Sequence, residues 1–168
     1  MIRYLLPLFL MGTLTSKAFS KQLDLCDKNP IFCRIVKNNP KIDLNYAMDL
    51  SDTIYNISLK YNIKSNKLIA IFAQESMYKL NAVNHKTKDY SIGQINIKTI
   101  NRYKFDKDRL LYDLDYAVEC SAKVLSDLKK RYSHREKDYW CRYNVGTGKQ
   151  ASIENKCKIY IDLVNRYL

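Results

Sequence analysis

The stretch that decides the fold runs from Ser65 to Met77 and reads SNKLIAIFAQESM. Within it, Leu68, Ile71 and Phe72 have the three- and four-residue spacing that lines up side chains on one face of an α-helix. Ser65 is a favourable N-cap, because its hydroxyl can accept a hydrogen bond from a free N–H of the first turn. The sequence therefore predicts a helix from the residue after Ser65 to about Met77, with one buried face.

Further helices are expected on both sides of this stretch. Periodic apolar residues predict them over 44–61, from Asp113 or Asp115 to Arg131, through Trp140 and Tyr143, and over 152–167. Glycine is common just past a helix end, so Gly146 and Gly148 should end the third of these. The polar run 79–90 predicts a loop, and any strand should be short and lie within 79–97. The predicted fold class is all-α, in a single compact domain.

Residues 1–20 have the order of features that is typical of a signal peptide. A basic residue is followed by an apolar run from Tyr4 to Leu14, and small residues allow cleavage after Ala18 or Ser20. The apolar run is much shorter than the ~20 residues that a membrane-spanning helix needs. We therefore expect an exported protein, in the periplasm, the cell wall or the extracellular space, with no stable membrane span after cleavage.

Cysteines near the start of the exported chain suggest a covalent link there. Export permits disulfides, and Cys26 and Cys33 enclose a short segment that contains a proline. Their pairing, which would close a small loop, is our first expectation. Residues 21–40 are accordingly predicted to be a disulfide-capable segment ahead of the main domain at 41–168.

The five cysteines are an odd number, so at least one must stay unpaired within the chain. The partner of Cys141 is open between Cys157 and Cys120. No Cys-x-x-Cys motif is present, and both histidines lie far from the cysteines in the sequence. We therefore expect no metal site and no cofactor.

The chain carries a net charge of +12 and stays strongly basic without the signal peptide. Such a surface attracts polyanions, which outside the cytoplasm are wall polymers, lipid head groups and released nucleic acid. Lys, Asn, Ile and Tyr are all abundant, as AT-rich codons would produce, and this composition explains part of the charge equally well. Charge alone does not choose the substrate.

Glu75 is the candidate catalytic residue because of its place on the predicted helix. It follows Leu68, Ile71 and Phe72 by seven, four and three residues, so its carboxyl should project from the apolar stripe. Desolvation would raise its pKa there, and glycosidic cleavage requires a protonated carboxyl as general acid. The alternative is a structural glutamate that reaches solvent or pairs with Lys79 one turn further on. The helix alone does not decide between them.

Four motifs surround this residue, and they read Ala73-Gln74-Glu75-Ser76, Asn81-Ala82-Val83-Asn84, Asp89-Tyr90-Ser91-Ile92-Gly93-Gln94-Ile95-Asn96 and Tyr143-Asn144-Val145-Gly146. In this order and at these separations they resemble the soluble lytic transglycosylase (SLT) domain, a relative of goose-type lysozyme. The similarity covers roughly 45–168 and is greatest to the small specialised transglycosylases of secretion, conjugation and pilus systems. It implies a lysozyme-like, mainly α-helical domain with a cleft for the glycan strands of peptidoglycan.

The resemblance also implies roles for individual residues. Glu75 would be the catalytic acid and then the base, and the residues expected to bind or line the substrate cleft are Ser76, Asn84, Ile92, Gln94, Ile95, Tyr143 and Asn144. Two positions depart from the family pattern, which usually has Gly at Ser91 and Ser at Asn84. Gly93 is expected to supply the flexibility that Ser91 lacks, and Asn84 can still donate a hydrogen bond.

The implied reaction is cleavage of the β-1,4 bond between N-acetylmuramic acid and N-acetylglucosamine. In this family one glutamate protonates the glycosidic oxygen and then deprotonates the sugar's own 6-hydroxyl. That hydroxyl attacks C1 and leaves a 1,6-anhydro end, without water. Glycosidases that follow the usual route need two carboxyls. Asp89 is a candidate second acid that could position a water, so lysozyme-type hydrolysis by a muramidase is the alternative.

Other classes of function compete with the enzyme. A catalytically inactive wall-binding assembly protein would not need an acid on the apolar stripe, so Glu75 argues against it. A secreted basic protein that binds nucleic acid or membranes would release its ligand at high salt. A DNA-binding helical module conflicts with the signal peptide and the cysteines. The expected partner is therefore peptidoglycan, with a component of a secretion, conjugation or pilus apparatus as a second candidate, and no nucleic acid.

Overall fold

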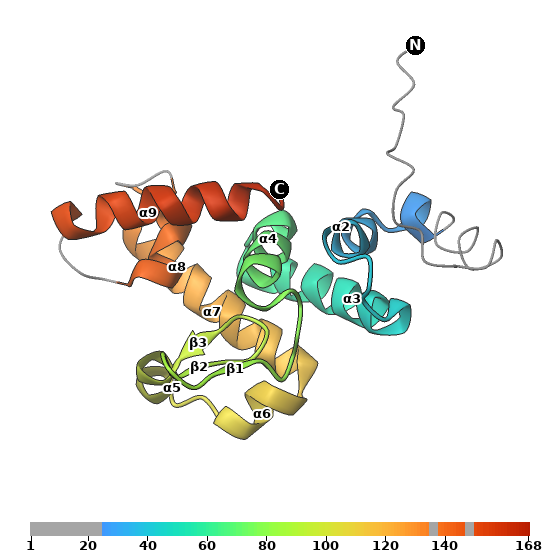
Figure 1. Ribbon diagram of the computed structural model, residues 1–168, viewed down its shortest axis with the longest axis horizontal. Helices are drawn as coiled ribbons and strands as arrows, with labels where there is room; N and C mark the ends of the chain where they lie inside the picture. Colours follow the sequence, from blue (N-terminus) through green and yellow to red (C-terminus); the bar gives the residue numbers. More distant parts are fainter. Residues whose placement is uncertain (1–24, 135–137, 147–149) are drawn as a thin grey trace, which may run out of the picture.

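The computed structural model describes residues 25–134, 138–146 and 150–168, so the predicted signal peptide at 1–20 lies outside it. The helices are α2 (Pro30–Asn38), α3 (Leu44–Tyr61), α4 (Ser65–Ser76), α5 (Ile97–Tyr103), α6 (Lys107–Tyr112), α7 (Leu114–Tyr132), the 3-10 helix η1 (Tyr139–Cys141), α8 (Arg142–Val145) and α9 (Gln150–Asn165) (Figure 1). Within the described ranges, no helix is long and apolar enough to cross a membrane.

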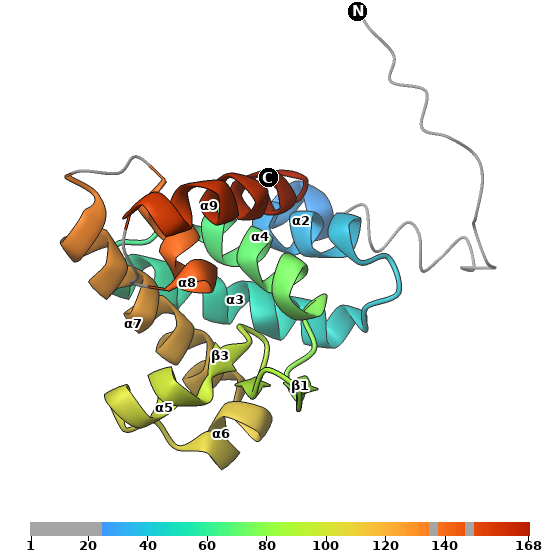
Figure 2. The same ribbon diagram turned by 60° about the vertical axis from the view of Figure 1, so that its left-hand side comes forward.

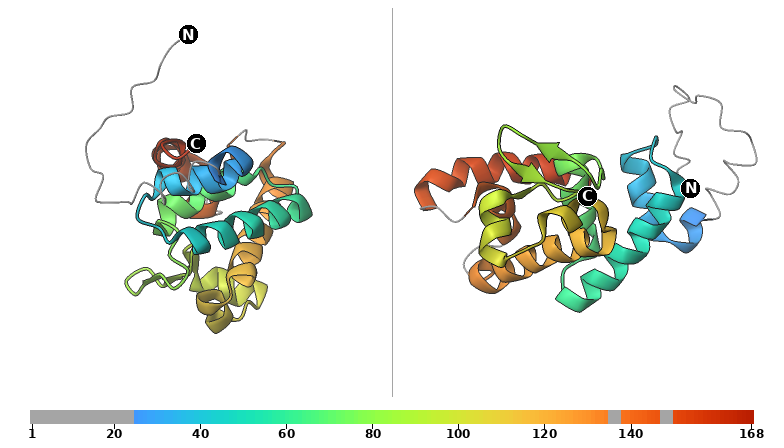
Figure 3. Two further views of the ribbon diagram at one scale, coloured as in Figure 1. Left: turned by 90° about the vertical axis from the view of Figure 1, so that its right-hand side faces the viewer. Right: turned by 90° about the horizontal axis from the view of Figure 1, so that it is seen from below.

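The strands are β1 (Val83–Asn84), β2 (Asp89–Tyr90) and β3 (Ile95–Asn96), which pair antiparallel in the order β1-β2-β3. Val83 lies opposite Tyr90, and Tyr90 lies opposite Ile95. With α5 and α6, this sheet occupies the side of the molecule opposite to α2 and α9 (Figure 1, Figure 3). The mainly α-helical prediction is confirmed, and the sheet lies within the range expected for a short β element.

Helix α4 lies at the centre of the molecule, with α2 and α3 on one side and α9 on the other (Figure 1, Figure 2). Leu68, Ile71 and Phe72 are fully buried, as the periodicity predicts, but Ile69 and Ala70 are buried as well. Each large apolar side chain removed from water contributes roughly 1.5–3 kcal/mol to folding. Helix α4 is therefore enclosed by the core and does not have one buried face and one solvated face.

Helices α7 and α4 begin in different ways. Helix α7 packs against α3 and α8, and its N-cap Asp113 accepts a hydrogen bond from the Tyr116 N–H at 3.0 Å. The prediction of a helix start at Asp113 is thus confirmed. The prediction of Ser65 as the N-cap of α4 is wrong, because Ser65 is already helical and the N-cap is Lys64, which makes no side-chain capping bond.

Helix α2 occupies the segment that was expected to form a loop between two cysteines. Asn29 is its N-cap and accepts a hydrogen bond from the Phe32 N–H at 3.0 Å, and Pro30 is the first helical residue. Proline suits that position because its missing N–H would have no partner there. Phe32 and Ile35 are fully buried, and α2 packs against α3 and α4. This segment is therefore part of the common core.

The disulfide expectations fail in one region and are resolved in the other. Cys26 and Cys33 are free thiols, so their expected disulfide is wrong for this structure. The chain here is helical and the thiols meet in a hydrogen bond; burial, followed by this bond, raises the pKa of Cys26 to about 12. Cys141 pairs with Cys157, with 5.2 Å between their Cα atoms, and Cys120 is a free, buried thiol. The disulfide therefore joins η1 to α9.

Candidate active site

Glu75 lies in the last turn of α4, where the helix leaves the core. The helix ends at Ser76, and Met77 and Tyr78 have left-handed backbone angles, with φ of 51° and 67°. The Met77 N–H donates to the Ala73 carbonyl at 3.0 Å, which closes the end of the helix. This sharp change of chain direction leaves the half-buried Glu75 side chain at the edge of a groove.

Two side chains from the last part of the chain contact the Glu75 carboxyl. The Tyr160 hydroxyl, on α9, donates to Glu75 Oε1 at 2.6 Å, and the Asn144 side chain makes a second hydrogen bond. Burial raises the pKa of Glu75 to about 7, while these two hydrogen bonds act to lower it and the charge of Asp89 acts to raise it. Near neutral pH the carboxyl is therefore present in both forms and can release and recover a proton.

The groove beside Glu75 has a volume of about 490 Å³. The turn before β3 lines one side of it with Gln94, next to Ile95 of the sheet, and α8 lines another with Tyr143 and Asn144. Residues of α5 and α7 continue the lining away from Glu75. Polar side chains beside an apolar surface suit a hydrated, ring-shaped ligand such as a sugar.

The turn that carries Gln94 has an unusual backbone. Ser91 and Gln94 have φ of 70° and 46°, in the left-handed region that is sparsely populated outside glycine. Gln94 Nε2 donates to the Ser91 carbonyl at 2.9 Å and to the Ala82 carbonyl at 3.2 Å. The buried Ser91 hydroxyl donates to the Leu110 carbonyl. The turn thus uses the amide nitrogen of Gln94, which leaves its side-chain oxygen for a ligand.

Gly93 is required in this turn for space. Its φ is not positive, whereas a Cβ at this position would collide with the hydroxyls of Ser121 and Tyr143. The Tyr143 hydroxyl donates to the Gly93 carbonyl at 2.9 Å, which ties α8 to the turn. The expectation that Gly93 supplies flexibility missing at position 91 is therefore wrong, because Ser91 takes the left-handed conformation itself.

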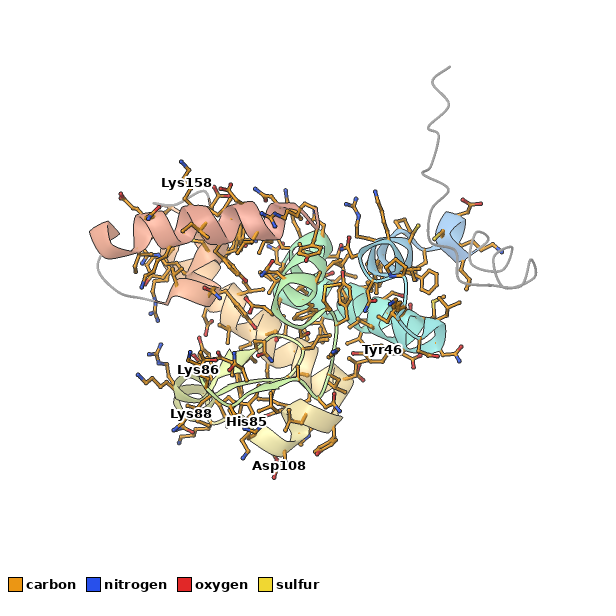
Figure 4. The ribbon with its side chains drawn as sticks, in the orientation of Figure 1. Tyr46, His85, Lys86, Lys88, Asp108 and Lys158 are labelled. Carbon is orange, nitrogen blue, oxygen red and sulfur yellow. A yellow bond between two sulfur atoms is a disulfide. The ribbon has the colours of Figure 1, made fainter. Side chains whose placement is uncertain are left out.

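The structure brings most of the predicted site residues together, and those that line the groove are Glu75, Asp89, Gln94, Ile95, Tyr143 and Asn144. Ser76 and Ile92 lie behind it: Ser76 Oγ donates to the Ile92 carbonyl at 2.8 Å, and the Ile92 side chain is fully buried. Asn84 is exposed on β1, where its Oδ1 accepts a hydrogen bond from the Lys86 N–H at 3.1 Å. Figure 4 shows Lys86 and its neighbour His85 at this hairpin, and Asn84 does not line the groove.

Sequence reasoning misses Tyr160, because this residue lies on the apolar stripe of the last helix with Ile153, Cys157 and Val164. A hydroxyl on a buried stripe needs a hydrogen-bond partner, and that requirement is the signal that could have identified it. In the described part of the chain, no three His, Cys, Asp or Glu side chains lie close enough together to hold a metal ion.

Two known proteins are similar to this chain in sequence. The chain is similar to Protein IpgF of Shigella flexneri, with 32% identity over 115 residues that cover 65% of this chain and 74% of IpgF. It is also similar to Invasion protein IagB of Salmonella typhimurium strain SL1344, with 33% identity over 98 residues that cover 55% of this chain and 61% of IagB. The match thus spans less than two thirds of IagB. No solved structure gave a significant match.

A family model described as the Transglycosylase SLT domain matches residues 52–160. This range is more than half of the chain and includes Glu75 together with both of its hydrogen-bond partners, Asn144 and Tyr160. The chain therefore belongs to the transglycosylase SLT domain family.

Proposed function

We propose that this chain is an exported lytic transglycosylase that cleaves the β-1,4 bond between N-acetylmuramic acid and N-acetylglucosamine in peptidoglycan and leaves 1,6-anhydro-muramyl ends. The observation that carries the proposal is the half-buried carboxyl of Glu75 at a groove, with its pKa raised to about 7. Membership of the SLT domain family supports the same type of reaction.

Glu75 is suited to both proton transfers of this reaction. Its protonated form would donate to the glycosidic oxygen as the bond from that oxygen to C1 breaks. The N-acetyl group of the muramyl residue would stabilise the positive centre. Hydrogen bonds from Tyr160 and Asn144 stabilise the carboxylate that is left. The carboxylate would then take the proton of the 6-hydroxyl as its oxygen bonds to C1, which restores the acid and consumes no water.

Hydrolysis by a lysozyme-type mechanism is the second candidate, and the placement of Asp89 favours it. Asp89 lines the same groove, and its Oδ1 accepts a hydrogen bond from Asn96 Nδ2 at 2.7 Å. A carboxylate held in this way could position a water for attack on C1. We give transglycosylation the first place because it requires only the one carboxyl whose pKa is raised.

Product analysis separates these reactions. Wild-type protein should release anhydro-muropeptides from purified peptidoglycan, as detected by mass spectrometry, and Glu75→Gln should release none while its circular dichroism spectrum is unchanged. Glu154→Gln is the matched control, because Glu154 is exposed on α9, outside the groove lining, and loses the same charge. Products with only reducing ends would establish hydrolysis in place of transglycosylation.

Two further results would remove the assignment. If Glu75→Gln clears peptidoglycan in a zymogram as well as the wild type does, Glu75 is not the acid. If wild-type protein binds peptidoglycan and cleaves none, the chain is an inactive wall-binding protein.

We also propose a setting for this activity. IagB is named as an invasion protein. A small exported enzyme that cleaves peptidoglycan suits localised wall opening for a secretion, conjugation or pilus apparatus. Residues 1–20 would act as a signal peptide that directs the mature chain to the periplasm or the cell wall. The catalytic domain would be 41–168, and helix α2 in the segment 21–40 packs on its core. N-terminal sequencing of the exported protein tests the cleavage site.

A further inference from the structure

The groove extends from Glu75 to a region lined by cations. Helix α5 contributes Lys98 and Arg102 to the lining, and α7 contributes Arg131. Helix α5 follows β3 and lies on the side of the sheet away from α4 (Figure 1, Figure 2). All three cationic residues are exposed to solvent. The two parts of the groove therefore differ in chemistry, with a carboxyl at one and positive charge at the other.

The protein neutralises the cations of this region only in part. Lys98 and Arg102 stand one turn apart on α5, and like charges at this spacing destabilise a helix. Among the described residues, neither Arg102 nor Arg131 has a hydrogen-bond or ion-pair partner. Asp127 lines the same groove and accepts a hydrogen bond from Tyr103, and its single negative charge stands against three positive ones.

Arg102 and Arg131 line the same groove from two different helices. Burial raises the pKa of Tyr103, and its hydrogen bond to Asp127 raises it further, while the charges of Arg131 and Arg102 both act to lower it. The positive charges of both residues therefore act on the same hydroxyl, although one comes from α5 and the other from α7. Two guanidinium groups that line one groove from different helices can both bind an anion that enters it.

The sugar backbone of peptidoglycan gives these cations nothing to neutralise. The anionic groups of peptidoglycan are carboxylates. They lie on the stem peptides or, where the peptide is absent, on the lactyl group of the muramyl sugar. Guanidinium groups bind carboxylates through paired, charge-assisted hydrogen bonds. We propose that Lys98, Arg102 and Arg131 form a carboxylate subsite of the groove, which binds the carboxylates of peptidoglycan and so selects its strands over uncharged glycans. This inference rests on the proposed function.

Binding in a catalytically silent background tests the subsite. The protein is Glu75→Gln, and the ligands are soluble uncrosslinked glycan strands with stem peptides, the same strands stripped by an amidase, and an oligomer of N-acetylglucosamine, which has no carboxylate. Adding Arg102→Gln and Arg131→Gln should raise the Kd for a carboxylate-bearing ligand about three- to tenfold, because exposed charge pairs are individually weak. The Kd for the uncharged oligomer should stay the same.

A matched pair of substitutions controls for the loss of net charge. Lys130→Gln and Lys158→Gln remove two positive charges from exposed positions outside the groove lining, and Figure 4 shows Lys158 pointing away from the body of the molecule on the outer side of α9. These changes should leave all three Kd values near those of the parent.

The three ligands identify the source of the carboxylate. If the arginine substitutions raise the Kd only for peptide-bearing strands, the stem peptide supplies the carboxylate. If they raise it only for stripped strands, the lactyl group supplies it. An unchanged Kd for both, or an equal loss on the uncharged oligomer or in the control pair, would overturn the subsite. Cleavage by the protein with Glu75 intact is measured separately, so a failure of the proposed function is recognised independently.

Discussion

The two walls of the groove beside Glu75 are built by different means. The helical wall, which consists of α8 and Tyr160 of α9, reaches the carboxyl with side-chain hydrogen bonds from Tyr160 and Asn144. The turn wall, residues 91–96, takes its shape from the left-handed backbone at Ser91 and Gln94. Single side-chain contacts can be removed one at a time, whereas a backbone shape is lost as a whole. We therefore expect graded effects in the helical wall and severe ones in the turn wall.

The largest effect on activity is expected in the turn wall, from Gly93→Ala. The new Cβ would collide with the hydroxyls of Ser121 and Tyr143 and push the turn away from α8. Overpacking of this kind costs about 1–3 kcal/mol, so the free energy of unfolding in urea should fall by that amount and zymogram clearing should be lost. Adding Ser121→Ala makes room and should restore part of the stability. If the Gly93→Ala protein is as stable and as active as the wild type, substitutions in the turn wall are not more severe than those in the helical wall.

A smaller, graded effect is expected in the helical wall from Tyr160→Phe. The Tyr160 hydrogen bond acts to lower the pKa of Glu75, so its loss should raise that pKa further above about 7. In the proposed reaction the protonated form of Glu75 acts first, so activity should be lost as pH rises through its pKa. The alkaline limb of the pH profile of kcat/KM should therefore move to higher pH by about one pH unit. Tyr55→Phe, at an exposed position on α3, should leave the limb in place.

A limb that stays where it is, or moves to lower pH, would show that the hydroxyl of Tyr160 does not stabilise the charged form of Glu75.

The smallest effect on activity is expected from replacing the disulfide with serines, as Cys141→Ser and Cys157→Ser. Each cysteine precedes one hydrogen-bond partner of Glu75 by three residues, so the bond joins the two supports of the helical wall. Helices α8 and α9 also pack directly on each other, which should preserve most of the activity at 25 °C. Losing a bridge over this loop should lower the free energy of unfolding by about 2–4 kcal/mol.

The free thiols of the N-terminal region provide the matched control for that change. Replacing Cys26 and Cys33 with serine is chemically the same substitution, but no disulfide is lost. Thermal unfolding should therefore change little. An equal loss of stability in both double variants would mean that the Cys141–Cys157 bond contributes nothing specific.

The sequence predicts the helix that carries Glu75 because the spacing of apolar residues records which face is buried. It does not predict that Ile69 and Ala70 are buried too, since full enclosure depends on helices distant in the sequence. Helix α2 did have a local signal, Asn29 followed by Pro30, which is a typical helix start. No helix is predicted here, because the two cysteines are interpreted as the ends of a disulfide loop.

For the candidate site, too, some residues could be predicted from the sequence and others could not. The motif residues that line the groove could be identified from the sequence because the order of the motifs is itself the signal. Tyr160 lies 85 residues from Glu75, and only the packing of α9 on α4 brings their side chains together. The left-handed φ of Ser91 could not be predicted, because this backbone region is unfavourable for serine and tertiary contacts must impose it. Disulfide pairing likewise depends on distances that exist only in the folded chain.

Trp140 is the single tryptophan of the chain, and it is buried at the junction of η1 with α9. Its ring centroid lies 6.0 Å from that of Tyr160, and the Lys67 ammonium lies 3.7 Å from the indole centroid. Indole emission depends on local polarity and nearby charge. The intrinsic fluorescence of Trp140 should therefore report, without any attached dye, whether Tyr160, the hydrogen-bond partner of Glu75, still packs near the indole. An optical probe of the candidate active site is part of the native sequence.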